Sequence, residues 1–85
     1  MENPQITHIV LDVLKQHQPP LPEFASFLGD MDGVTKVDVS VVEMDAKTES
    51  LKIIIDGTKL DYEVLRSYMA RQGAVIHSVD QVVVE

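Results

Sequence analysis

Hydrophobic and polar positions alternate through two runs in the middle of the chain, residues 34–42 and residues 51–57. Such alternation, with many β-branched side chains, is typical of a β-strand that buries one of its faces. The polar stretch 45–50 separates the two runs, so we expect an antiparallel hairpin within Gly33–Gly57. The other segments are predicted to flank this hairpin.

A nearly continuous apolar run, residues 6–14, precedes the hairpin and predicts a central strand that is covered on both faces. Pro19 and Pro20 follow and end this strand, because proline has no N–H to donate to a neighbouring strand. Pro22 and Glu23 then suit the first turn of a helix. The apolar stripe of that helix consists of Phe24, Phe27, Leu28 and Met31.

A second helix is predicted after the hairpin. Asp61 is a good N-cap, and Gly73 stands where a left-handed residue commonly ends a helix. Residues 74–84 form the last predicted strand. The apolar stripe of this second helix consists of Val64, Leu65, Tyr68 and Met69.

The predicted element order is strand, helix, strand, strand, helix, strand. Right-handed crossovers in the two halves predict a single α+β domain over residues 1–85, a ferredoxin-like sandwich with both helices on one face of an antiparallel sheet. Counted along the chain, the expected strand order is 4132. The first and third strands are expected to run in one direction and the second and fourth in the other. Residues 1–5 are expected to form a flexible N-terminus.

An acidic composition limits the partners that this domain can bind. Fourteen acidic and seven basic residues give a formal net charge of −7, which repels phosphate backbones and anionic membrane surfaces. We therefore expect neither nucleic acid nor a membrane as a partner. The chain has no cysteine and no apolar run of about 18 residues, so thiol chemistry is excluded and a cytoplasmic location is expected.

Apolar residues remain on the sheet face that the helices do not cover, and both edge strands end in valines. Uncovered apolar faces and unpaired strand edges favour association between chains. We therefore expect a homo-oligomer. The predicted interface residues are Val10, Leu14, Val42, Ile54, Val82 and Val84.

Four aspartates carry the sharpest chemical prediction. With the first and third strands in the same direction, these aspartates line up across the open face, with neighbours about 5 Å apart. Close carboxylates repel unless a cation neutralises them, and oxygen ligands suit Ca²⁺ or Mg²⁺. Ordinary solvated carboxylates, relieved by Lys36 and Lys52, are the alternative. In sheet order, the row consists of Asp80, Asp12, Asp56 and Asp38.

Other groups of side chains are weaker candidates for a metal site. Acidic residues gather at the tip of the hairpin, and His8 and His77 are expected on neighbouring strands. Solvation of a polar loop and local hydrogen bonds of the histidines are the structural alternatives. No nucleophile motif or phosphate-binding loop is present, so we do not expect an enzyme. The alternative metal ligands are Glu43, Asp45 and His77, with Glu49 also at the tip.

Three segments carry a resemblance to a known family: Leu11–Lys15 followed by His17, Val41–Asp45, and Gly73–Asp80. Through these segments, residues 6–85 resemble the small uncharacterised archaeal proteins of domain-of-unknown-function family 211. The resemblance implies a ferredoxin-like fold and a multi-subunit, ring-like assembly. It implies no established activity.

The function predicted from these patterns is that of an oligomeric binding or regulatory module that holds a divalent cation through carboxylates. The alternative is a small-molecule sensor whose ligand lies between subunits. A cation would be lost when Asp12 is replaced by Asn, whereas a sensor ligand would depend on residues around Val10 and Ile54.

Overall fold

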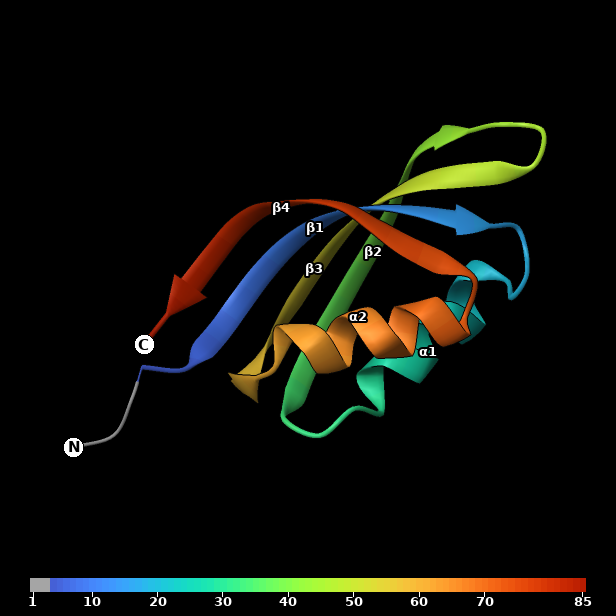
Figure 1. Cartoon of the computed structure of the whole chain (residues 1–85). Helices are drawn as coiled ribbons and strands as arrows, with labels where there is room; N and C mark the ends of the chain where they lie inside the picture. Colours follow the sequence, from blue (N-terminus) through green and yellow to red (C-terminus); the bar gives the residue numbers. More distant parts are fainter. Residues whose placement is uncertain (1–3) are drawn as a thin grey trace.

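The computed structural model describes residues 4–85 and has a four-stranded sheet with two helices on one face (Figure 1). The strand order is β2-β3-β1-β4, and the βαββαβ element order confirms the predicted ferredoxin-like α+β fold. The elements are β1 Ile6–Gln16, α1 Leu21–Gly29, β2 Val34–Met44, β3 Thr48–Leu60, α2 Tyr62–Arg71 and β4 Ala74–Val84.

The directions of the strands correct one prediction. Strand β1 pairs antiparallel with both β3 and β4, and β2 pairs antiparallel with β3. The expectation that the first and third strands run in one direction was therefore wrong. A right-handed crossover through α1 makes β2 parallel to β1, and the hairpin then reverses the chain, so β3 enters between them in the opposite direction.

The helix ends follow the local sequence. Helix α1 starts after Pro20 and has a proline in its first turn, as predicted. At the start of α2, the Asp61 side chain accepts hydrogen bonds from the backbone N–H groups of Glu63 and Val64, at 3.0 and 3.2 Å, which confirms its role as a cap. Helix α1 has nine residues and α2 has ten, so neither described helix is long enough to cross a membrane.

The core lies between the helices and one face of β1 and β3. Alternate residues of these central strands point toward the helices, as the period of two in a strand requires. Phe24, Leu28, Leu65 and Met69 supply the helical side of this core and are fully buried. The strand residues of the core are Ile9, Leu11, Val13, Leu51, Ile53, Ile55, Leu60 and, at the start of β4, Ala74.

The sheet is longer than the helices that cover it (Figure 1). The molecule measures 49 × 22 × 18 Å, and the β2–β3 turn extends beyond the helices at one end. At the other end, Gln5 and Glu85 exchange two main-chain hydrogen bonds of 2.9 and 2.8 Å. The flexible N-terminus predicted over residues 1–5 falls largely on residues 1–3, which lie outside the described residues.

Candidate functional site

A buried lysine organises a polar cluster at the end of β1. The side chain of Lys15 is fully buried, and its ammonium group lies 5.4 Å from the centre of the Phe24 ring. An ammonium group in such a place needs hydrogen-bond acceptors and a counter-charge. Lys15 Nζ donates to Glu49 Oε1 at 3.0 Å and to the backbone carbonyl of Gln16 at 2.8 Å. The cluster therefore joins the end of β1 to the start of β3.

Glu49 is shared between two cationic side chains. Its Oε1 accepts from Lys15, and its Oε2 lies 3.2 Å from Nδ1 of His17, while its own side chain is only 8% exposed. Burial alone raises the pKa of Glu49, but hydrogen bonds and positive charge from Lys15 and His17 outweigh it and hold this pKa below its usual value. The carboxylate is thus ionised at neutral pH and binds both side chains.

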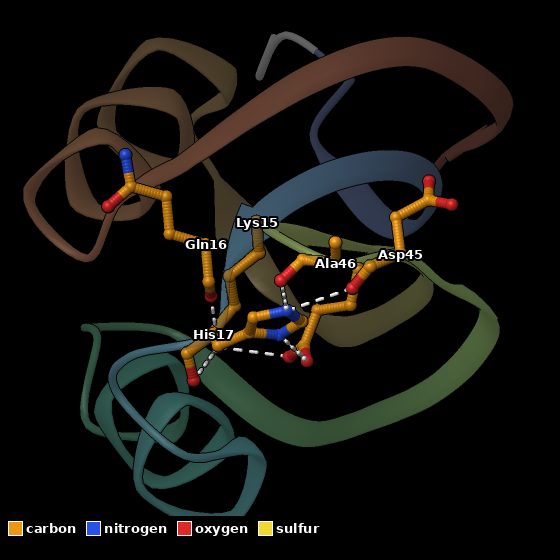
Figure 2. A network of polar contacts seen from close by, with 6 residues as sticks. Lys15, Gln16, His17, Asp45 and Ala46 are labelled. Carbon is orange, nitrogen blue, oxygen red and sulfur yellow. Dashed lines mark hydrogen bonds and ion pairs between the residues drawn. The ribbon is translucent and has the colours of Figure 1, made fainter.

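His17 joins this pair to the β2–β3 turn (Figure 2). Its Nε2 lies 3.0 Å from the carbonyl oxygen of Asp45 and 3.1 Å from that of Ala46. The hydrogen bond with Glu49 is the main cause that raises the pKa of His17, and the two carbonyls raise it further against a smaller effect of desolvation. The polar cluster of Lys15, His17 and Glu49 therefore fastens the β1–α1 loop to the turn.

One feature of the sequence points to this cluster, although it was not among the predicted site residues. Lys15 continues the alternation of Ile9, Leu11 and Val13, the residues that point toward the helices. A lysine on the side of the strand that faces the helices is expected to be buried and to need a partner of opposite charge. The predicted acidic group at the hairpin tip does include that partner, Glu49, but the cations it binds in the structure are side chains of the same protein.

The predicted row of four aspartates does not form, because β1 and β3 run in opposite directions. Asp12 is opposite Lys52 on β3 and Ser78 on β4. Asp56 is opposite His8, which lies four residues before Asp12 on β1, and Asp38 is opposite Ile54. The four carboxylates therefore lie at different positions along the strands and do not form a row from one strand to the next.

Two members of the row do remain close. Asp12 and Asp80 line one shallow hollow of about 240 Å³ together with Lys52. Asp12 also pairs with His77 at 3.3 Å, and Asp80 accepts a hydrogen bond of 2.7 Å from Ser78. Among residues 4–85, no three His, Cys, Asp or Glu side chains are arranged to hold a metal ion, and this includes those at the hairpin tip.

The last strand reaches this hollow through irregular pairing with β1. Its register shifts beside Val10 and again beside Asp12, and these shifts leave Asp80 and His77 between paired positions. The predicted row requires Asp80 on the open face, and in the structure its side chain lines the hollow beside Asp12 and Lys52. Because a bulge depends on the partner strand, the parity of β4 could not be derived from its own sequence.

His8 forms a second polar group on the open face. Its Nδ1 lies 2.5 Å from Asp56 Oδ1, and its Nε2 lies 3.1 Å from the side-chain oxygen of Gln81. The hydrogen bond with Asp56 is the main cause that raises the pKa of His8, against a smaller opposing effect of desolvation. His8 and His77 therefore have separate carboxylate partners, and the two imidazoles do not form the metal pair considered from the sequence.

Replacing Asp56 by Asn is expected to lower the pKa of His8 toward its ordinary value of 6.5. A raised pKa in the folded state contributes stability that is complete below pH 6.5 and is lost as the pH rises through the raised value. The variant should therefore lose that part of the pH dependence of unfolding. NMR titration of the ring protons measures the change, and the exposed His77 is the internal control. An unchanged midpoint of His8 would contradict the assignment.

Two comparisons place this chain among known sequences. Residues 7–85 match the family model DUF211, which is described as uncharacterised ArCR. An uncharacterised protein, MJ0319, of Methanocaldococcus jannaschii is 37% identical over 78 residues, which cover 92% of this chain and 80% of that protein. Neither description names an activity, a ligand or a partner.

Proposed function

Because the chain belongs to the archaeal DUF211 family, whose description names no activity, we propose its function from geometry: an oligomeric binding or regulatory module whose subunits join along the edges of the sheet. Strands β2 and β4 form these edges. Each pairs with a neighbour on one side only, so its other side carries unpaired backbone N–H and C=O groups. A second copy of the chain can pair with either edge.

The apolar side chains on both edges carry this proposal. On β2, Val42 is 68% exposed. Val41 is 43% exposed, although it lies opposite the core residue Leu51 and points to the same face of the sheet. On β4, Val79, Val82 and Val84 are between 42% and 49% exposed. Edge strands that stay monomeric are usually blocked by lysine, proline or inward-pointing charge. Residues 82–84 contain no lysine, proline or charge, so this end of β4 is open to pairing, whereas β2 carries Lys36 and has a bulge at Val42.

The interface residues predicted on the open face support the proposal unequally. Leu14 is 43% exposed and remains available for contact. Val10 is only 8% exposed, because it lies in the central strand between Ile54 and Gln81. Association through the edges therefore has more exposed apolar surface to bury than association through the centre of the open face.

Replacing Val82 or Val42 by Lys is expected to convert an assembly into a monomer, because the lysine places a charge on an edge that must lose water. Sedimentation and native mass spectrometry at micromolar concentration measure the change. The matched control is Val64→Lys, since Val64 is also 43% exposed but lies on α2, away from both edges. A wild-type protein that sediments as the 9.5 kDa monomer would refute the proposal.

The edge at β2 also supports the sensor alternative. A shallow hollow of about 410 Å³ lies between α1 and β2. Its wall is mainly apolar, with Leu21, Ala25, Val37 and Val39 beside Lys36 and Asp38. A neighbouring subunit on the β2 edge would cover it and create an enclosed site for a small molecule.

The same native mass spectra distinguish the ligand classes. A cation held by Asp12 and Asp80 predicts that the assembly loosens in EDTA and reforms with Ca²⁺, and that Asp12→Asn abolishes both effects. A ligand between subunits predicts a bound small-molecule mass that survives EDTA. An assembly that neither responds to EDTA nor carries such a mass would leave self-association as the function of these surfaces.

A further inference from the structure

We propose that His17 is a pH-controlled latch: the protonated ring holds the β2–β3 turn against the β1–α1 loop, and the neutral ring releases the turn. The two segments are distant in the sequence and meet through this side chain (Figure 2). The proposal concerns the motion of the turn within one subunit. It does not depend on the proposed assembly.

The contacts of the ring require a proton on each nitrogen. Nδ1 faces the Glu49 carboxylate at 3.2 Å, and Nε2 faces two backbone carbonyl oxygens at 3.0 and 3.1 Å. Carboxylates and carbonyls only accept hydrogen bonds, and a neutral imidazole has a single N–H to donate. Only the imidazolium ion can donate on both sides. Loss of one proton therefore breaks one of the two connections.

The connection that breaks is the one to the turn. Hydrogen bonds to an ionised acceptor are stronger than those to a neutral carbonyl, so the neutral ring keeps its proton on Nδ1, toward Glu49. Lys15 fixes the carboxylate of Glu49 from its other oxygen. The lone pair of Nε2 then faces the carbonyl oxygens of Asp45 and Ala46, which repel it. Deprotonation thus acts on the turn and leaves the Lys15–Glu49 pair intact.

The surroundings contain few other groups that could titrate with the ring. Lys15 of β1 and Glu49 of β3 are the charged side chains in contact with this site. The Asp45 carboxylate points away from the ring (Figure 2), and Lys47 makes no ion pair within the described residues. From α1, the neighbour of Lys15 is the uncharged ring of Phe24.

The direction of the switch follows from the same contacts. They raise the pKa of His17 above 6.5, so the latch is closed below that pH and opens as the pH rises through the raised value. Once open, the turn keeps its own hydrogen bond of 2.8 Å from Asp45 N–H to the Thr48 carbonyl. The turn is therefore expected to move as a unit that hinges at Thr48 and Glu49, whose pairing with β1 and with Met44 remains.

NMR spectroscopy of the full chain from about pH 5 to about pH 9 tests the latch across the range in which histidine titrates. The ring is expected to lose the proton of Nε2 and keep that of Nδ1. The carbonyl ¹³C shifts of Asp45 and Ala46 should follow with the same midpoint. Hydrogen-exchange protection of the turn, corrected for intrinsic rates, should fall about tenfold for each pH unit by which the midpoint exceeds that of a ring bonded to Glu49 alone, because only the contacts with the two carbonyls are lost when the turn opens. Unchanged turn signals across the ring transition would overturn the proposal.

Two variants separate the latch from a general effect of pH. His17→Gln is expected to abolish the pH dependence of the turn signals, because its amide does not titrate in this range. His77→Gln removes another histidine, one that is 78% exposed, and should leave that dependence unchanged. A His17→Gln protein that keeps the wild-type dependence contradicts the proposal. If that variant does not fold, the tautomer and carbonyl shifts of the wild-type protein still decide between the two outcomes.

Discussion

Replacing Glu49 by Gln is expected to lower the free energy of unfolding by about 3–5 kcal/mol, the usual cost of leaving one member of a buried ion pair without its partner. Lys15 cannot reach water, because its side chain is fully buried between β1, β3 and the Phe24 ring. The glutamine keeps the shape of the side chain but removes the counter-charge. Urea denaturation at neutral pH and one protein concentration measures the loss.

A control and a double variant isolate the role of the charge. Glu63→Gln also removes the partner of a cation, Arg66, but both side chains are more than half exposed, so a much smaller loss of stability is expected. The double variant Lys15→Met with Glu49→Gln removes the buried charge altogether and should recover most of the stability. A double variant as unstable as Glu49→Gln alone would contradict this account.

Replacing Gly57 by Ala is expected to cost about 1–3 kcal/mol or more, because no space exists for a methyl group at this position. A Cβ atom on Gly57 would lie 2.1 Å from the backbone carbonyl oxygen of Gly33 and 2.8 Å from a methyl group of Leu60. The Gly33 carbonyl cannot simply turn away, since it accepts a 2.8 Å hydrogen bond from the N–H of Thr58. The strands must therefore separate where β2 begins.

The matched control for this variant is Gly29→Ala at the end of α1. A Cβ atom there would have nothing within 4 Å, and alanine is a better helix former than glycine by about 1 kcal/mol. Thermal unfolding should therefore show a lower midpoint for the Gly57 variant and an unchanged or higher midpoint for the Gly29 variant. Equal midpoints for the two variants would show that the contact with Gly33 relaxes at no cost.

The six elements could be predicted because their signals are local. Alternation identified the two hairpin strands, and a nearly continuous apolar run identified β1. Helical spacing identified the two apolar stripes except for Val64, which is 43% exposed, and Asp61 and Gly73 marked the ends of α2. Gly73 has a φ of 73°, the left-handed conformation expected after the helix. Each of these features depends on residues that are close together in the sequence.

The candidate site was harder to derive, because it depends on which residues face each other across strands. Placing β1 parallel to β3 put Asp12 beside Asp56, whereas the observed register puts Lys52 beside Asp12. The handedness of the crossover was enough to exclude the parallel arrangement. The contact of His17 with the turn could not be predicted in this way, since it depends on where two irregular segments come together.

The position of β1 at the centre of the sheet has a consequence for how the chain is made. This strand ends at residue 16, but its two partners begin only at Thr48 and Ala74. At synthesis rates of about 5–20 residues per second, β1 waits roughly 2–9 s until β3 has been made and roughly 3–14 s until β4 has been made. Until β3 has been made, the apolar side chains of β1 have no neighbouring strand, and until β4 follows they have one on only one side. The nascent chain, more than the finished domain, is therefore the form that most needs protection from aggregation.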